Sequence, residues 1–428
     1  MNMKKMMKTA VIAAILGTGF VPSAYADVSV EDVKCTQRYP WNGLVDIEYT
    51  IACDDPEAEI YVNPVGFNGD TGLTVFPTHF TGDGATNTVK AGKHTMVWDA
   101  KADMGSVFSA KNFQIKMYAG KKLSRYIVID ISGGTEAENY PIRHSIEGPN
   151  LADDTCRTTE IWMRLIPPGT FMMGSPEDEL GRTDNEDLHR VTLTQPFYMG
   201  VFEVTQRQWE LVKGDRPSRF NTDYETRPVE TVSYADVRAY CPDYPPSAKT
   251  FGSDGFLGKL QGKTAITGFD LPTEAQWEYA CRAGTLTSFN DGSSLSGTAG
   301  SQSLNNLGRY YSNGFNGAYV SNDASTKMTT AKVGSYMPNA IGLYDMHGNV
   351  DEWCRDFYKV HLGVESVVDP LCTTRNNYYD IIVRGSAWRH GASESTSAHR
   401  GWAAANGSNS GRDDFRGFRI SCSGNLDR

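Results

Sequence analysis

Cysteine thiols have the widest range of chemistry in this 428-residue chain, because they form disulfides, bind metals and act as nucleophiles. The chain holds eight of them: Cys35, Cys53, Cys156, Cys241, Cys281, Cys354, Cys372 and Cys422. An even number favours disulfide bonds in a protein that leaves the reducing cytoplasm. Metal binding is the alternative, but no two cysteines have the Cys-x-x-Cys spacing typical of zinc sites.

The first 26 residues have the features of a secretory signal peptide. Three lysines within the first eight residues precede an apolar run over residues 9–20, and Ala-Tyr-Ala ends at residue 26. We therefore predict a signal peptide over 1–26 and a secreted or periplasmic protein. An uncleaved anchor is the alternative, but the apolar run is shorter than the roughly 20 residues of a spanning helix. No stable membrane span is expected after cleavage.

The charge of the mature chain argues against a nucleic-acid partner. Removing the three lysines of the signal peptide from 41 basic residues leaves 38 against 51 acidic residues, a net charge near −13. Nucleic-acid binding requires a concentrated basic surface, and the arginines here are dispersed. The expected partner is an exported protein or a carbohydrate.

Alternating apolar and polar residues predict an N-terminal all-β domain. The pattern over 45–51 has the period of a half-buried strand, and similar runs follow over 59–67, 94–100, 112–119 and 124–132. Turn-rich stretches separate them, and none has a helical period. We therefore predict a β-sandwich of immunoglobulin or fibronectin type over 27–135. Cys35 and Cys53 flank the first strand pair, which favours a disulfide between them; two free thiols are the alternative.

Residues 136–155 mix Gly, Glu, Asn and Pro without periodicity and are predicted to be a linker. The domain over 156–428 is rich in glycine and aromatic residues, with a few short helices whose starts can be located. Thr205 with Gln208 and Thr273 with Gln276 have the spacing of capping boxes, and Ser233 is a third predicted N-cap. Loops and side-chain packing are expected to hold this α+β domain together.

Four groups of segments between Ile166 and Cys422 carry a family resemblance. They are IPPGTFMMGS with FYMGVFEVTQRQW, RPVETVSYADVRAYC with FDLPTEAQWEYACRAGT, VGSYMPNAIGLYDMHGNVDEW, and VRGSAW with FRGFRI. In this order they resemble the sulfatase-modifying-factor family, the formylglycine-generating-enzyme-like domains. The resemblance implies a decorated C-type-lectin-like fold with little regular secondary structure.

The resemblance also implies where catalysis would occur. The family's founding activity is the oxygen-dependent oxidation of a sulfatase cysteine to formylglycine by two cysteines that bind copper(I), a soft metal suited to thiolates. Aligning this chain's RGSAW with the family's glycine-serine-aromatic motif places His390 and Ser395 at the two cysteine positions. Ser386 and Ala387 replace the motif's glycine and serine, and Asp351 stands where the family usually has tryptophan. The expected pocket is altered on several sides.

Two enzymatic alternatives remain open. His390 and His399 could together hold iron or copper, as in the iron-dependent sulfoxide synthases that share the fold. Those relatives take their iron histidines largely from an added helical domain, which this chain does not show. In a working formylglycine-generating enzyme another cysteine would have to take over, and Cys354 is the nearest by sequence.

A calcium site is also implied by the resemblance. In the family the segment corresponding to GLYDMHGNVDEW winds around a calcium ion, which gives the side chains of Asp345 and Glu352 and the carbonyls of Gly348 and Val350 as ligands. Clustered oxygens suit a hard cation, and Gly348 permits a sharp backbone turn. The alternative is a helix start capped by Asp345. A second ion is placed near Asn313, Gly314 and Asp323.

For the remaining cysteines, the resemblance suggests a disulfide between Cys241 and Cys422. Cys354 and Cys372 bracket a short excursion and could pair, which leaves Cys156 with Cys281. The favoured function is an extracytoplasmic scaffold that binds a ligand or protein and lacks the copper cysteines. The divergent metal-dependent oxidoreductase and the formylglycine-generating enzyme are the alternatives.

Overall fold

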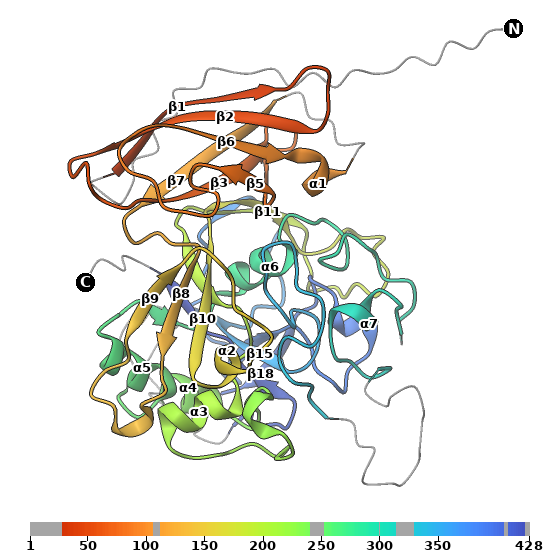
Figure 1. Cartoon of the computed structure of the whole chain (residues 1–428). Coiled ribbons are helices and arrows are strands. Elements are labelled where there is room, and N and C mark those ends of the chain that lie inside the picture. The colour runs from red at the N-terminus through yellow and green to blue at the C-terminus, as the bar shows by residue number, and fades with distance from the viewer. Residues whose placement is uncertain are drawn as a thin grey trace, which may run out of the picture. The chain divides into compact units, whose positions relative to one another are not determined.

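The chain divides into two compact units, Met1–Ser124 and Arg125–Arg428. The computed structural model describes residues 28–105, 112–239, 252–298, 300–313, 329–405 and 410–423 (Figure 1). Within these residues no helix is long and apolar enough to cross a membrane. The predicted signal peptide over 1–26 lies outside the described residues.

The first unit contains two antiparallel sheets. Its elements are β1 (Val28–Gln37), β2 (Leu44–Cys53), β3 (Tyr61–Asn68), β4 (Leu73–Val75), β5 (Phe80–Gly82), β6 (Gly92–Asp99), α1 (Ala100–Met104) and β7 (Phe113–Gly120). One sheet has the order β1-β2-β6-β5 and the other the order β4-β3-β7.

The two sheets share one hydrophobic core. Val45, Ile47, Tyr49 and Ile51 of β2 are buried at every second position, as the alternating pattern predicts. They pack in one cluster with apolar residues of β3, β6 and β7. The predicted all-β sandwich is therefore confirmed.

The structure divides the chain after Ser124, earlier than the predicted end of the first domain at residue 135. The strand predicted over 124–132 is β8 (Tyr126–Asp130), which belongs to the second unit, where it pairs with β10 (Glu160–Ile166). The predicted linker over 136–155 contains β9 (Ile142–Ser145), which pairs with β8. Backbone pairing therefore makes this segment part of the second unit.

The second unit combines short strands, short helices and long loops. Its remaining strands are β11 (Gly169–Met173), β12 (His189–Leu193), β13 (Phe197–Gly200), β14 (Phe269–Asp270), β15 (Asp351–Phe357), β16 (Val367–Val368), β17 (Asp380–Arg384), β18 (Gly401–Ala404), β19 (Arg416–Gly417) and β20 (Ser421–Ser423). Its helices are α2 (Thr155–Thr158), α3 (Gln206–Lys213), α4 (Tyr234–Arg238), α5 (Phe256–Thr264), α6 (Glu274–Arg282) and α7 (Leu304–Leu307), with 3₁₀ turns η1 (Gly134–Glu136), η2 (Tyr224–Thr226) and η3 (Ala392–Ser395).

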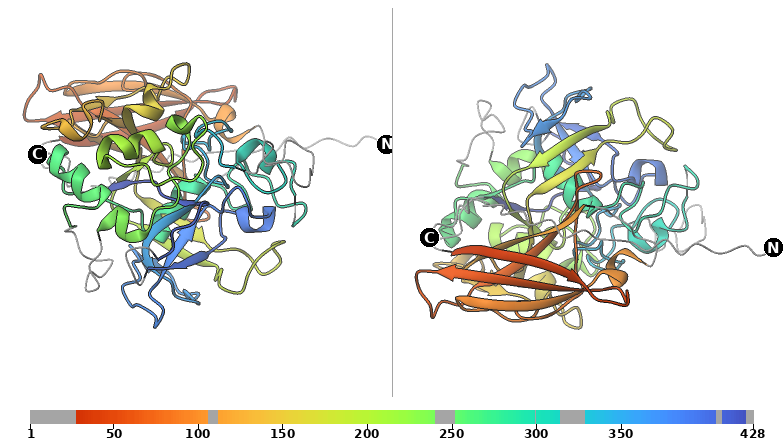
Figure 2. Two further views of the ribbon diagram at one scale, coloured as in Figure 1. Left: turned by 90° about the horizontal axis from the view of Figure 1, so that it is seen from below. Right: turned by 90° about the horizontal axis from the view of Figure 1, so that it is seen from above.

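Three sheets form in this unit, with orders β14-β20-β13-β10-β8-β9, β11-β12-β16 and β18-β17-β15-β19. The ladders are antiparallel except for β12 with β16 and β15 with β19. Figure 2 shows the short helices, yellow to green, among long loops. The predicted α+β organisation with little regular structure is confirmed.

The predicted helix starts are also confirmed. The hydroxyls of Thr205 and Thr273 accept from the backbone N–H three residues on, and the Gln208 and Gln276 side chains accept from the N-cap backbone. Ser233 caps α4 in the same way. These reciprocal bonds satisfy helix N–H groups within four residues of sequence, which is why the sequence alone locates them.

Candidate functional site

The residues predicted for catalysis lie in the loop that joins β17 to β18. Arg384, the last residue of β17, pairs with Glu278 of α6, and Arg400, the last residue before β18, pairs with Glu274 of the same helix at 2.6 Å. All four side chains are buried. The loop over 385–400 is therefore fixed to α6 at both ends by buried ion pairs.

The imidazole of His390 faces the carboxylate of Asp351, with 3.7 Å between Nδ1 and Oδ1. Asp351 is buried, and burial raises the pKa of its carboxyl group, while His390 and Arg416 act to lower it. The His390 side chain is one quarter exposed, and its ring packs edge-on against Phe415. The His390 imidazole and the Asp351 carboxylate, which the sequence predicts at one site, thus lie side by side.

Ser395, the second of these positions, is enclosed. Its side chain is fully buried, and its hydroxyl donates to the carbonyl of Gly391 at 3.1 Å. Its own carbonyl is 2.8 Å from Nδ1 of His347. The Ser395 hydroxyl therefore serves the local turn η3.

His399 faces a different carboxylate. Its Nδ1 lies 3.8 Å from Oε1 of Glu186, and burial lowers its pKa. Glu186 accepts hydrogen bonds from Ser175 and Thr183. The described residues form no group of three or more His, Cys, Asp or Glu side chains that could hold a metal ion. An iron or copper site at His390 and His399 stays a prediction.

The segment predicted to bind calcium is held in a tight, buried turn. Asp345 and Gly348 have positive φ values of 57° and 100°. A Cβ atom on Gly348 would lie 2.2 Å from the carbonyl oxygen of Arg309, so only glycine fits. One oxygen of Asp345 accepts from Gly334 N–H at 2.6 Å, and the other, although buried, has no hydrogen-bond partner among the described residues.

The other predicted calcium ligands differ in how they are engaged. Both carboxylate oxygens of Glu352 accept from Arg419, and one also accepts from the Trp277 indole at 2.7 Å. The N–H of Val350 donates to Glu203, a fully buried carboxyl group that also accepts from Asn349. Glu352 is therefore ion-paired with the guanidinium of Arg419, whereas one carboxylate oxygen of Asp345 has no hydrogen-bond partner among the described residues.

Three buried carboxyl groups, Glu203, Asp345 and Glu352, thus lie around the guanidinium of Arg419, and the buried Arg157 also acts on Asp345. Burial, followed by repulsion from Asp345 and Glu352, raises the pKa of Glu203 well above its usual value. Burial is also the main cause that raises the pKa of Asp345 to about 6. The excess of negative charge and the unengaged oxygen of Asp345 fit a cation at this place.

Sequence reasoning missed Glu203 and Arg419, which complete this cluster. Both are charged residues inside apolar runs of the family segments, VFEV and GFRI. A charged residue flanked by apolar residues is the signal that could have located them, because a buried charge requires a partner.

The second predicted ion site is described in part. The Asn313 amide donates to the Gly308 carbonyl at 2.7 Å and accepts from Tyr310 N–H at 2.9 Å. Gly314 and Asp323 lie outside the described residues. In the described part of this site, the Asn313 side chain is hydrogen-bonded to the backbone of the turn that contains it.

Three predicted disulfides are wrong, because their cysteines are free thiols in the structure. In the β1–β2 ladder Cys35 lies opposite Ile47 and Cys53 opposite Val28. Six residues of strand separate the two places, roughly 20 Å, whereas a disulfide requires Cα atoms within about 7 Å.

The other cysteines have separate surroundings. The thiol of Cys156 lies 3.6 Å from the Asn150 carbonyl, and that of Cys281 lies 3.7 Å from the Ser397 hydroxyl. The thiol of Cys354 points to the Glu352 carbonyl and that of Cys372 to the Thr374 carbonyl. Cys422 is also a free thiol, and Cys241, its predicted partner, lies outside the described residues.

One protein family matches most of the second unit. The family described as "Sulfatase-modifying factor enzyme 1-like domain" matches residues 149–422. The chaperone protein LppX of Paenibacillus barcinonensis is 33% identical over 193 residues, 39% of this chain and 64% of LppX. The formylglycine-generating enzyme of Mus musculus is 29% identical over 254 residues, 52% of this chain and 65% of the enzyme.

Among solved structures, PvdO from Pseudomonas aeruginosa aligns with 26% identity and a TM-score of 0.44, over 61% of this chain and 94% of PvdO. The chain spans less than two thirds of the length of LppX and of the mouse enzyme. The family match covers well over half of the chain and contains every side chain of the cluster around Arg419. The chain belongs to the sulfatase-modifying factor enzyme 1-like family.

Proposed function

We propose that this protein is an extracytoplasmic binding protein that uses the family scaffold to recognise a ligand or another protein, without copper chemistry. The observation that carries the proposal is the state of residues 390 and 395. His390 faces Asp351, and Ser395 is enclosed with its hydroxyl bonded to Gly391. Neither side chain supplies the thiolate that copper(I) prefers.

The described thiols nearby do not replace them. Cys281 and Cys354 are fully buried, and burial raises the pKa of Cys281 to about 12 and that of Cys354 well above its usual value. A thiol that stays protonated is a poor metal ligand and a poor nucleophile. This favours binding over formylglycine formation.

The relative LppX is named a chaperone protein, which is a role in binding other proteins. The formylglycine-generating enzymes among the relatives represent the competing function. An exported protein or a carbohydrate is the proposed class of partner.

A calcium ion is proposed as a structural part of this scaffold. Asp345 would hold it with its unengaged oxygen, together with the carbonyls of Gly348 and Val350 and an oxygen of Glu352. A divalent cation would offset the charge of three buried carboxyl groups, which the guanidinium groups of Arg419 and Arg157 balance only in part. Bound calcium would hold the turn at Gly348 in place.

The test is elemental analysis of the purified mature protein, together with a His390→Ala variant. We expect about one or two calcium ions per chain and no iron or copper in either protein. Iron or copper at near-stoichiometric level in the wild type that disappears in the variant would overturn the proposal in favour of an oxygen-dependent enzyme.

A second test asks whether the protein makes formylglycine. A peptide with the sulfatase cysteine motif is incubated with the protein, copper(I) and oxygen, and formylglycine is measured by mass spectrometry. We expect none, whereas formylglycine from the wild-type protein would contradict the proposal. The His390→Cys, Ser395→Cys double variant is the matched control, and copper(I) binding by it would show that only the thiols are missing.

A further inference from the structure

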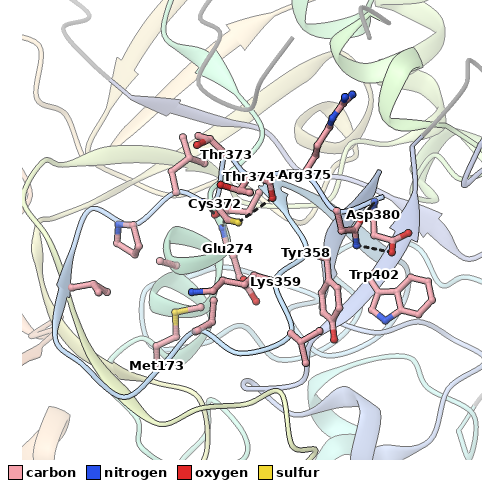
Figure 3. A pocket seen from close by; sticks show the side chains of 18 of the residues that line it. Met173, Glu274, Tyr358, Lys359, Cys372, Thr373, Thr374, Arg375, Asp380 and Trp402 are labelled. Carbon is pink, nitrogen blue, oxygen red and sulfur yellow. Dashed lines mark hydrogen bonds between the residues drawn. The ribbon is translucent and has the colours of Figure 1, made fainter. Parts of the chain in front are cut away.

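A pocket of about 1210 Å³ lies in the second unit (Figure 3). His390, Ser395 and Asp351 are not among the residues that line it. Its floor comes from the start of α6 and the end of β15, and its walls from the loop over 358–378, from β16 and from Trp402 of β18. Typical small-molecule sites enclose roughly 300–1,000 Å³. The pocket is therefore larger than a small ligand requires.

Exposed apolar side chains gather around this pocket. Val360, Val368, Tyr378 and Trp402 line it and are 53–72% exposed, and Val364 on the same loop is 73% exposed. Leu362, Val367 and Leu371 extend the apolar wall. Single exposed apolar residues are ordinary on protein surfaces, but a contiguous group marks an interaction site.

The acids of the floor are already engaged. Asp356 accepts from the N–H groups of Glu274 and Cys372, at 2.7 and 2.8 Å. Glu274 forms a two-point ion pair with Arg400. A ligand therefore meets a floor whose carboxylates hold the protein together rather than bind the ligand.

Lys359 and Arg375 are cations that line the pocket, and the Arg375 guanidinium donates to the Tyr379 hydroxyl. Lys359 lines the pocket, and its ammonium group makes no hydrogen bond or ion pair with any of the described residues. Figure 3 shows the Lys359 side chain extending in the direction of Met173. A carboxylate on the ligand would complement this charge.

Two sheet edges border the pocket. Val367 and Val368 form β16, the edge of the sheet β11-β12-β16, and Trp402 belongs to β18, the edge of the sheet β18-β17-β15-β19. An edge strand leaves one row of backbone groups without a strand partner, and an extended peptide can pair with such a row. An extended peptide can use both features at once, because its side chains pack on the apolar rim and its backbone pairs with a sheet edge.

We infer that this pocket binds an extended polypeptide segment with apolar side chains and a nearby carboxylate. The apolar side chains of the bound segment would cover the rim formed by Val360, Val368 and Trp402. The carboxylate of the segment would form an ion pair with Lys359. The inference rests on the proposed binding function, which it deepens by naming the partner. The elemental analysis reports on bound metal, whereas the peptide titration reports on this pocket. Failure of the proposed function is therefore distinguishable from failure of this inference.

The experiment titrates the full mature protein with a fluorescein-labelled heptapeptide of leucine, valine and phenylalanine that carries one glutamate, and follows anisotropy. We expect saturable binding, weakened about tenfold or more by Val368→Asp and by Trp402→Ala, which corresponds to at least about 1.4 kcal/mol. Met337→Asp is the matched control, because Met337 is 59% exposed and lies outside the pocket.

Charge reversal gives an independent readout. Lys359→Glu is expected to weaken binding of the glutamate peptide and to strengthen binding of a peptide in which lysine replaces the glutamate. The inference is overturned if the peptide does not bind, if Met337→Asp weakens binding as much as Val368→Asp, or if chitotriose binds in the pocket and the peptide does not.

Discussion

Arg419 and Glu352 form a two-point ion pair in the interior of the second unit: Nε lies 2.7 Å from Oε2, and Nη2 lies 2.6 Å from Oε1. Both side chains are fully buried. The guanidinium also donates to the carbonyls of Gly200 and Tyr344. One arginine near the end of the chain thus joins three segments that are far apart in sequence.

Arg419→Met is expected to lower the free energy of unfolding of the second unit by about 3–5 kcal/mol, because it leaves buried carboxylates without their cation. Urea unfolding followed by tryptophan fluorescence measures the change. Lys332→Met is the control, since Lys332 pairs with Asp154 at the surface, where a loss of less than about 1 kcal/mol is expected. Similar losses in the two variants would contradict the assigned role.

The raised pKa of Asp345, about 6, predicts a pH dependence of stability. The native carboxyl group holds its proton at a pH where the unfolded chain has lost it, so its contribution is fully present below about pH 4. That contribution falls as the pH rises toward 6 and beyond. In metal-free buffer, we expect wild type to lose roughly 1–3 kcal/mol relative to Asp345→Asn between pH 4 and pH 7.

The comparison with Asp345→Asn is needed because His347 acts in the opposite direction. Burial lowers the pKa of His347 to about 4, so its contribution is lost as the pH falls. His347 is present in both proteins and cancels in the difference. A difference between the two proteins that does not change with pH would show that Asp345 is not perturbed.

Calcium is expected to raise the melting temperature of the protein at neutral pH, because it binds the folded state and offsets the repulsion around Asp345. The measurement is a thermal melt in millimolar calcium against a melt in chelator. Asp345→Asn should reduce the increase, and magnesium at the same concentration is the control for ionic strength. An equal increase in wild type and variant would place the ion elsewhere.

Ser386→Gly is expected to stabilise the protein by about 1 kcal/mol. Ser386 has a φ of 68°, a conformation that costs an L-residue about 1–2 kcal/mol, and its buried hydroxyl has no hydrogen-bond partner among the described residues. Ser386→Ala removes the hydroxyl but keeps the backbone strain, so it should stabilise less. If Ser386→Gly unfolds more easily than wild type in urea, the strain is not relieved by glycine.

The structure predicts that cysteines 35, 53, 156, 281, 354, 372 and 422 react with a thiol reagent in the unfolded protein without reductant. Mass spectrometry of the labelled protein gives the count. Cys35→Ser should lower the count by one. A count that instead rises by one would indicate that Cys53 had been released from a disulfide with Cys35.

Local patterns were readable from the sequence because they depend on neighbours in the chain. The alternation of Val45, Ile47, Tyr49 and Ile51 predicts one buried face of β2, and Thr205 with Gln208 predicts a helix start. The ordered family segments added the fold of the second unit. These inferences were confirmed because a strand face or a capping box is complete within a few residues.

Pairing between distant segments could not be read in the same way. The alternation over 124–132 indicates a strand, but only the ladder between β8 and β10 assigns that strand to the second unit. The positions of Cys35 and Cys53 in sequence allow a disulfide, and the register of β1 against β2 separates them. Register depends on the whole sheet, which a local pattern does not contain.

The sequence by itself determined the alternating strands of the sandwich, the helix caps and the family. Only the tertiary structure brought Glu203, Asp345 and Glu352 around Arg419, and only it gathered Val360, Val368 and Trp402 at one pocket. The physical reason is that charge compensation and apolar contact act through space, between side chains that lie tens to hundreds of residues apart.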